Sequence, residues 1–420
     1  MESIRRRKPS MKPIETNGKA TEAAEEEPLS PSARLFHEPN FNVHVIGIMG
    51  LKSRINSQVI KEHLPHTLLK HPRFSSLQVV DEKKNGEMKW VRTKVDLDKH
   101  IVVPQVDEQN LQESPDKFVE NYIQNLSTTT LDKSKPMWDL HLLNVKTSDA
   151  EAVGIFRIHH SIGDGTSLIS LLLACMRQTA DPDKLPTIPG NKKRPSIINS
   201  SGHFTKGLQR YVMKIWYFMK LVWYTMVDVL MFIATVMFLK DTNTPIKGRP
   251  GSEFNPRRIV YGTALADMMD KDTEAKWGNW VGFVLLPFKI ALRDDPLEYV
   301  REAKATIDRK KNSLEAIYTF SISEIALKLF GIKTSSSISH KIITNTTMCF
   351  SCLPGPQEEI GFYGHPLANL APGSYGQPHM TIVLSVDESV IPDPHQLADD
   401  FEQSLKLFKD AVVERGLCHE

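Results

Sequence analysis

Hydrophobic and polar residues alternate with the period of two that is typical of strands in several segments of the first half of the chain. These segments are residues 42–49, 76–81, 87–95, 138–145 and 152–158. Asn85-Gly86 lies between the second and third of them, and this dipeptide favours the tight turn of a hairpin. We therefore predict strands here, two of which are joined as a hairpin.

Apolar residues at helical spacing occur between these strands and continue through the second half. The predicted helices are residues 57–70, 114–126, 166–177, 296–311, 313–329 and 394–414, and the further strands are residues 280–286, 341–351, 359–363 and 379–387. Ser114-Pro115 has the pattern of a helix N-cap followed by proline at the first helical position. Helices and strands mixed in both halves, without a regular βαβ repeat, predict an α/β protein with mixed sheets.

Residues 221–239 are apolar apart from a single charged residue, Asp228. As a helix they would span about 28 Å, close to the thickness of a hydrocarbon core. Trp216 and Trp223 lie toward the N-terminal end and suit an interfacial anchor. Asp228 would cost about 2.5 to 3.5 kcal/mol at the centre of a bilayer, so it must face protein, water or headgroups. A membrane span, a helix lying in the interface and a buried core helix stay open, with membrane contact favoured.

Composition indicates a folded, water-compatible protein of two-domain size. The 420 residues are more than one hydrophobic core usually serves. With 40% hydrophobic and 24% charged residues, the chain is neither a disordered protein nor a polytopic transporter. The net charge of +2 leaves no basic field for nucleic acid, and four cysteines fit a reducing compartment.

Changes in composition along the chain divide it into five predicted parts. Residues 1–27 carry a basic run and then an acidic run, and they are expected to be a disordered arm without the apolar core of a signal peptide. An N-terminal domain, 28–180, is followed by a Pro-, Lys-, Asn- and Ser-rich linker, 181–209. A membrane-associated helix, 210–240, then leads into a C-terminal domain, 241–420.

Two adjacent histidines, His159 and His160, end a predicted strand just before a predicted helix. If the strand continues through them, they point to opposite faces, so one can face a cleft while the other packs behind it. A neutral imidazole can take a proton from a hydroxyl, which accelerates a reaction by about 10² to 10⁴. Asp164 can cap the next helix or hold an arginine, and Gly165 permits close backbone approach.

The string His159-His160-Ser161-Ile162-Gly163-Asp164-Gly165 resembles the His-His-x-x-x-Asp-Gly signature of the CoA-dependent acyltransferase superfamily. Pro28-Leu29-Ser30-Pro31 with Leu35-Phe36, the string from Ser134 to His141, and Leu384-Ser385-Val386-Asp387 resemble the plant wax ester synthase/diacylglycerol O-acyltransferases. The resemblance covers about residues 28–418. It implies a two-domain sandwich like that of chloramphenicol acetyltransferase, with the active site in a channel between the domains.

The resemblance also implies a reaction and a role for each residue of the motif. A fatty acyl group would move from acyl-CoA to a long-chain fatty alcohol, giving a wax ester, or to diacylglycerol, giving triacylglycerol. His160 would be the general base that deprotonates the acceptor hydroxyl, with no covalent acyl-enzyme. His159 would be a packing or orienting residue, Asp164 would hold the loop through a salt bridge, and Gly165 would keep the channel floor open.

Location and partners follow from the same resemblance. It implies the endoplasmic reticulum membrane with the catalytic domains facing the cytosol, and the plasma membrane as a further location. The partners would be acyl-CoA as co-substrate, the alcohol or diacylglycerol, and membrane lipid. Neither a metal nor a redox cofactor would be required.

The chain departs from the family near residues 262–264. After the strand that Arg258-Ile259-Val260-Tyr261 resembles, the family has a long segment that contains an Asn-Asp-Val motif. No Asn-Asp dipeptide occurs in this sequence. The simplest hypothesis is an isoform or gene model that lacks an internal exon. An incomplete second domain and a non-catalytic, lipid- or partner-binding function therefore form the alternative.

Two other signals point to metal chemistry, and neither is favoured. Cys349 and Cys352 form a CxxC without a second ligand pair, inside a predicted strand. His159, His160 and Asp164 could in principle hold a metal for hydrolysis, but adjacent strand histidines diverge.

Overall fold

The computed structural model describes residues 27–81, 87–106, 114–187, 207–241, 263–264, 277–279, 281–287, 292–348, 356, 358–371, 384, 386 and 390–417. These residues divide into two compact units. The first contains the described residues up to 187, at 263–264, at 277–279 and at 356–371, and the second contains the rest. Residues 1–26 of the predicted arm and 188–206 of the predicted linker lie outside the described residues.

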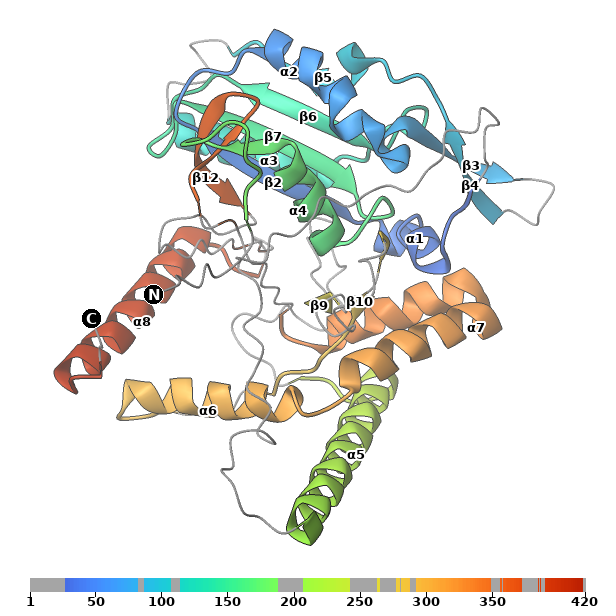
Figure 1. Ribbon diagram of the computed structural model, residues 1–420, viewed down its shortest axis with the longest axis vertical. Coiled ribbons are helices and arrows are strands. Elements are labelled where there is room, and N and C mark those ends of the chain that lie inside the picture. Colours follow the sequence, from blue (N-terminus) through green and yellow to red (C-terminus); the bar gives the residue numbers. More distant parts are fainter. Residues whose placement is uncertain are drawn as a thin grey trace, which may run out of the picture. The chain divides into compact units, whose positions relative to one another are not determined.

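A seven-stranded mixed sheet in the order β5-β6-β7-β2-β12-β11-β8 forms the centre of the first unit (Figure 1). Its strands are β2 His44–Leu51, β5 Ile101–Val102, β6 Trp138–Leu143, β7 Ala152–His159, β8 Met176–Gln178, β11 Ile360–Phe362 and β12 His365–Ala371. β5 pairs with β6 in parallel, and the other neighbours pair antiparallel. The predicted α/β class with mixed sheets is therefore confirmed.

The predicted hairpin belongs to a second, three-stranded sheet, β1-β4-β3. Strand β1 is Glu27–Pro28, β3 is Ser76–Asp81 and β4 is Glu87–Arg92. The register runs from Ser76 opposite Arg92 to Asp81 opposite Glu87, which confirms the antiparallel pairing. The Asn-Gly dipeptide that predicted it lies outside the described residues.

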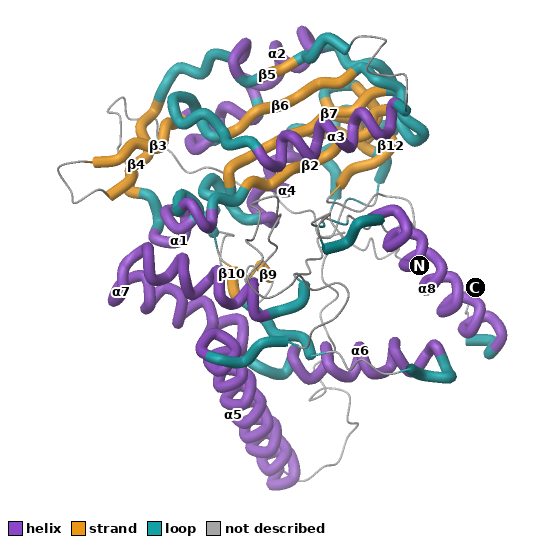
Figure 2. The backbone as a smooth tube through the Cα atoms, turned by 180° about the vertical axis from the view of Figure 1, so that it is seen from behind, coloured by secondary structure: helices purple, strands orange, loops and turns teal. Residues whose placement is uncertain are grey.

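Helices α3 (Pro115–Thr128) and α4 (Gly165–Ala174) cover opposite faces of the main sheet, as the two views in Figures 1 and 2 show. The side chains of β7 alternate between the two cores. Phe156 and Ile158 pack in the cluster that contains α4, whereas Val153 and Ile155 pack in the cluster that contains α3. Because both faces are covered, every residue of β6 and β7 is buried.

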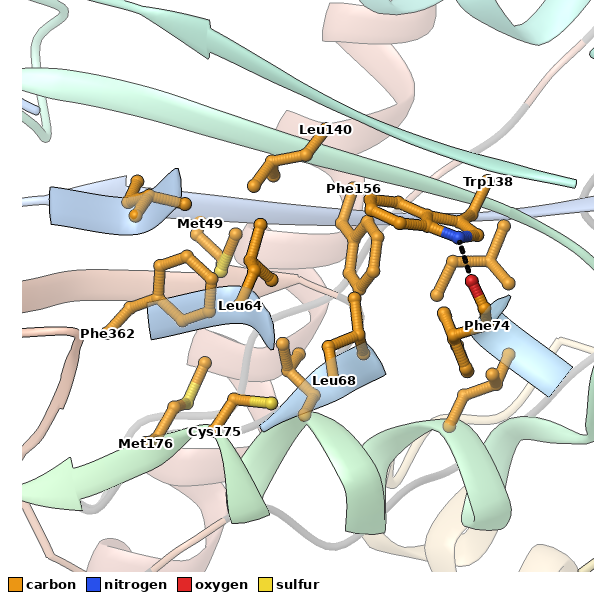
Figure 3. Close-up of a cluster of buried hydrophobic side chains, with 14 of the residues drawn as sticks. Met49, Leu64, Leu68, Phe74, Trp138, Leu140, Phe156, Cys175, Met176 and Phe362 are labelled. Carbon is orange, nitrogen blue, oxygen red and sulfur yellow. Dashed lines mark hydrogen bonds between the residues drawn. The ribbon is translucent and has the colours of Figure 1, made fainter. Parts of the chain in front are cut away.

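Aromatic and aliphatic side chains fill the core on the α4 side (Figure 3). Trp138 has no exposed surface, and its indole Nε1–H donates a hydrogen bond to the backbone oxygen of Phe74 at 2.9 Å. Phe156 meets the Trp138 ring edge-on, with centroids 5.9 Å apart. The hydrogen bond satisfies the polar atom that burial of a tryptophan would otherwise leave without a partner.

A buried ion pair fixes α3 against the sheet on the other face. Arg157 of β7 donates two hydrogen bonds to the carboxylate of Asp139 on β6, at 3.0 and 2.7 Å. Its remaining nitrogen reaches the backbone oxygens of Leu126 and Thr129 at the C-terminal end of α3. Burial opposes ionisation of Asp139, but its hydrogen bonds lower the pKa to about 2. The charge is thus compensated, and the helix end is satisfied.

The helix starts agree with the sequence patterns. Pro115 is the first residue of α3, and Asp164 caps α4. In the remaining helices of the first unit, Ser30 caps α1 (Pro31–Leu35) and Asn56 caps α2 (Ser57–His63). The predicted helix 57–70 is correct only for α2, because short 3₁₀ turns replace the α-helix from Leu64 onward.

Two predicted segments are wrong in part. Residues 341–345 were predicted as strand but continue helix α7, because packing of this segment against α5 overrides the β-propensity of its isoleucines. The helix predicted to reach residue 177 ends at Ala174. Met176–Gln178 then forms β8, which pairs with β11 at the sheet edge.

Long helices make up most of the second unit. They are α5 Gly207–Met237, α6 Pro296–Lys310, α7 Glu315–Asn345 and α8 Pro394–Glu414, with the two-residue strand β10 Val281–Gly282. Gly331, with φ 76°, interrupts α7, and Figure 1 shows its two segments folded back on each other. Glycine adopts this left-handed conformation without strain. Helix α8 confirms the predicted closing helix, and α6 confirms the prediction to within one residue.

A buried ionic cluster joins α5, α6 and α7. Lys310 Nζ contacts Asp228 Oδ1 at 2.9 Å and Glu315 Oε2 at 2.7 Å, and Arg309 contacts Asp228 at 2.6 Å. The side chains of Asp228 and Glu315 are 1% exposed, and that of Lys310 is 6% exposed. Of the three surroundings predicted for Asp228, the structure therefore shows protein.

Replacement of Lys310 by methionine should destabilise the second unit, because it leaves Asp228 and Glu315 as buried carboxylates without their common cation. The expected loss in unfolding free energy is about 3 to 5 kcal/mol. Thermal unfolding in mild detergent measures it. Lys304→Met on the same helix breaks an exposed pair with Asp308 and should change stability by less than about 0.5 kcal/mol. Equal effects of the two substitutions would contradict a stabilising cluster.

Candidate active site

The predicted motif lies where β7 ends and α4 begins. His159 is the last residue of β7, and its backbone N–H donates to Met137 at 2.9 Å. The backbone N–H of His160 donates to Val43 at 3.0 Å, and α4 starts at Gly165. The motif therefore forms a short strand-to-helix loop whose first residues are hydrogen-bonded to the residues just before β6 and β2.

His160 is buried, and it contacts residues that are distant in the sequence. Its ring stacks on Phe36 with centroids 4.2 Å apart, and its Nδ1 lies 3.0 Å from Asn279 Oδ1. In the part of the chain that the structure describes, no group forms a hydrogen bond with Nε2. Burial lowers the pKa of His160, partly opposed by a hydrogen bond with its own backbone, the Asp164 charge and Asn279. The ring is thus neutral near pH 7, with one nitrogen able to accept a proton.

His159 has a separate set of partners. Its Nε2 lies 2.9 Å from Asn42 Oδ1, and its Nδ1 lies 2.6 Å from Ser161 Oγ. The ring stacks on His37 and has no exposed surface. Burial holds the pKa of His159 well below its usual range. The His159 ring is thus fully buried among other side chains, as expected for a packing residue. Its packing or orienting role in the reaction stays a prediction.

Asp164 is the N-cap of α4. Its Oδ1 accepts hydrogen bonds from the Ser167 backbone N–H at 2.9 Å and from Thr166 Oγ1 at 3.0 Å. The helix-capping alternative raised by the sequence is therefore realised. The salt bridge implied for Asp164 and the channel-floor role of Gly165, the first residue of α4, stay predictions.

Residues 277–279 complete the surroundings of the motif, and sequence reasoning missed them. The Trp277 indole donates to the Ile162 backbone oxygen at 2.7 Å, and the Asp164 backbone N–H donates to the oxygen of Gly278 at 3.0 Å. A Cβ atom on Gly163 would lie 3.0 Å from the Trp277 ring, so glycine allows this close approach. The only sequence signal was a Trp-Gly-Asn string before an apolar segment, and no periodicity connects it to residue 160.

The residues proposed for a metal site do not converge. His159 and His160 have different hydrogen-bond partners, as described above. Among the described residues, no three side chains of His, Cys, Asp or Glu are placed to hold a metal ion together. Cys349 and Cys352 lie outside the described residues.

Burial keeps several other histidines of the first unit neutral. It lowers the pKa of His37, His44 and His100 to about 4. It lowers the pKa of His71 to about 3, and the centroid of this ring lies 3.9 Å from that of the Trp277 ring. The surroundings of the motif thus disfavour positive charge.

Comparison with known proteins identifies similar chains. The family model described as Wax ester synthase/diacylglycerol acyltransferase catalytic domain matches residues 38–255, and the model described as WS/DGAT C-terminal domain matches residues 277–409. His160 lies in the first range and Asn279 in the second. The predicted junction near residues 262–264 falls between them.

Similar full-length relatives come from Arabidopsis thaliana. Wax ester synthase/diacylglycerol acyltransferase 11 is 42% identical over 480 residues, covering 95% of this chain and 98% of that protein. Wax ester synthase/diacylglycerol acyltransferase 6 is 42% identical over 492 residues, covering 94% and 95%. Both alignments exceed the 420 residues of this chain, so each contains positions at which this chain has no residue.

Among solved structures, the wax ester synthase/diacylglycerol acyltransferase from Marinobacter aquaeolei VT8 is similar. It is 14% identical, with a TM-score of 0.48, and the match covers 93% of this chain and 100% of that chain.

We expect the first unit to lose stability as the pH falls from about 6.5 to about 4. Histidines of the unfolded chain take up a proton near pH 6.5, whereas His37, His44 and His100 do so in the fold only near pH 4. Acid therefore favours the unfolded chain throughout this window, by at most about 1.4 kcal/mol per pH unit for each histidine. Denaturant unfolding at a series of pH values measures the slope.

A variant that removes one of these histidines should reduce this slope. His44→Phe is suited to this test because the residue is buried beside His159. His66→Phe, at an exposed position of the same unit, is the matched control. An unfolding midpoint that stays constant between about pH 6.5 and about pH 4.5 would show that these histidines do not titrate on unfolding.

Proposed function

This chain belongs to the wax ester synthase/diacylglycerol acyltransferase family, and we propose that it transfers a fatty acyl group from acyl-CoA to a long-chain fatty alcohol or to diacylglycerol. Family membership supports the reaction class. One observation carries the proposed mechanism: the ring of His160 is buried and neutral, and its Nε2 accepts no hydrogen bond from any described residue. This nitrogen can therefore accept a proton from a substrate. The long-chain acceptor and the acyl-CoA donor are the proposed partners.

In the proposed reaction, His160 Nε2 removes the proton from the acceptor hydroxyl. The hydroxyl oxygen attacks the thioester carbonyl carbon, and the tetrahedral intermediate then expels CoA as a thiolate. The imidazolium returns its proton to that thiolate, so the ring leaves the cycle in its starting state. The reaction involves no oxidation or reduction, and the thioester is already an activated acyl group. The proposal therefore requires neither a redox cofactor nor a metal.

His160→Gln should lower ester formation by about 10² to 10⁴, because glutamine can still donate to Asn279 but cannot accept a proton as a base. The assay uses purified membranes, radiolabelled acyl-CoA, and fatty alcohol or diacylglycerol in separate reactions. His66→Gln is the control for a histidine at an exposed position.

The same assay separates the proposed function from its alternative. Ester formation with one acceptor and not the other identifies the acceptor class. A His160→Gln rate equal to that of the unmodified chain would overturn the mechanism. No ester with either acceptor, from a chain that remains folded, would overturn the proposed activity and favour the non-catalytic alternative.

We further infer that α5 lies in a membrane interface and does not cross the bilayer. Among the described residues it is the one helix whose length and composition would permit a span, which by itself is weak evidence. Residues 211–220 are all exposed and include Trp216 and Tyr217, which suit the headgroup region. Farther along, Thr225, Asp228 and Phe232 recur at helical spacing on a buried face.

The ionic cluster argues against a span. A bilayer spanned by residues 221–239 would place Asp228, and with it Arg309, Lys310 and Glu315, near the depth where charges are most costly. The exposed N-terminal half, in contrast, can insert its aromatic rings while Lys214 and Lys220 contact phosphates. We place the proposed membrane at the endoplasmic reticulum, with the catalytic part on the cytosolic side, and propose the plasma membrane as a further location.

Topology tests can distinguish an interfacial helix from a span. Epitope tags inserted before and after α5, within residues 188–206 and 242–250, should be equally accessible to protease in sealed microsomes. Protection of one tag only would show that α5 crosses the bilayer. Trp216→Ser combined with Trp223→Ser should reduce the vesicle-bound fraction, whereas Leu405→Ser with Leu407→Ser, at exposed positions of α8, should not.

A further inference from the structure

Asn279 is the polar side chain that the sequence did not single out and that directly contacts the proposed base. It is 6% exposed. Its Oδ1 lies 3.0 Å from His160 Nδ1, and its Nδ2 donates to the backbone oxygen of Ser161 at 3.4 Å. One side chain thus contacts both the ring and the backbone of the residue that follows it.

The second contact fixes the orientation of the amide. A backbone carbonyl can only accept a hydrogen bond, so the NH₂ group of Asn279 must face Ser161. The amide oxygen then faces His160, and an oxygen can only accept. His160 Nδ1 must therefore carry the hydrogen, and in a neutral ring this leaves the lone pair on Nε2.

The backbone around Asn279 is held to the motif loop at several points. Ser32 Oγ donates to the Asn279 backbone oxygen at 3.4 Å. Gly278 accepts from the backbone of Asp164, and Trp277 donates to Ile162, as described above. The amide is therefore presented by a segment that is docked on the loop it orients.

We propose that Asn279 is a positioning residue that holds His160 in the Nδ1–H tautomer and presents the Nε2 lone pair to the acceptor hydroxyl. This inference rests on the proposed function of His160 as a base. The neutral amide also explains why asparagine suits the position better than aspartate. A carboxylate there would favour the imidazolium, and a protonated ring cannot act as a base.

Two substitutions of Asn279 distinguish its effect on the tautomer of the His160 ring from its effect on the charge of that ring. Asn279→Leu keeps similar volume and removes the acceptor, so kcat for ester formation should fall by about 10² while KM changes little. Asn279→Asp keeps an acceptor and adds charge. It should retain activity at high pH, with the limb of the pH–rate profile that reports the base moved upward by about one unit or more.

Histidine-selective ¹⁵N spectra of the full chain in detergent report the tautomer of His160, and this measurement does not depend on enzymatic activity. The His160 signal is assigned by its absence in His160→Gln. It should report the Nδ1–H form in the unmodified chain and in Asn279→Asp at high pH, and a smaller fraction of that form in Asn279→Leu, where the hydrogen bond of the ring with the His160 backbone remains. Asn42→Leu is the matched control because Asn42 contacts His159, so it should change the His159 signal and leave that of His160 unchanged.

The activity assay and the ¹⁵N spectra test the proposed function and the positioning role independently of each other. An unmodified chain that makes no ester but loses the Nδ1–H form on Asn279→Leu would contradict the proposed function and support the positioning role. A His160 signal that is the same in Asn279→Leu and in the unmodified chain would overturn the positioning role, whatever the activity. An unchanged pH profile in active Asn279→Asp would overturn it as well.

Discussion

The burial of strand β7 on both faces is the constraint on which the first unit depends. β7 lies between β2 and β6 and is paired along its whole length, from Ala152 opposite Leu51 to His159 opposite His44. A slip of one residue would exchange the side chains of the two cores, so hydrophobic packing on both sides fixes the register. That register determines where the strand ends. The motif loop leaves the sheet at this end, and α4 begins five residues after His160.

Buried ion pairs join secondary-structure elements in both units. Arg157 satisfies Asp139 in the first unit, and Lys310 lies between Asp228 and Glu315 in the second. Such pairs contribute little net stability compared with apolar packing, but removal of one member leaves an unpaired buried charge. They therefore specify which elements meet: α3 with the sheet, and α5 with α6 and α7. In the proposed interfacial arrangement, the second cluster also limits how the apolar helix α5 can meet a membrane.

The environment of His160 acts on two properties of the ring, its charge and its tautomer. Burial disfavours the charged ring, and the amide of Asn279 accepts a hydrogen bond without supplying a negative charge. A neutral ring of defined tautomer is what proton abstraction from an alcohol requires. The stacked ring of Phe36 restricts the imidazole on one face. Three segments far apart in the sequence thus define the state of one side chain.

The sequence by itself determined those features that depend on local patterns. Alternation predicted β6 and β7, capping residues and prolines marked the starts of α3, α6 and α8, and the His-His string placed the motif at a strand end. Residues 341–345 were predicted wrongly because their isoleucines favour strands and only packing against α5 makes them helical. Asn279 was missed for a related reason. The tertiary structure alone brings it to His160 across 119 residues, and hydrogen-bond partners so far apart leave no periodic signal in the sequence.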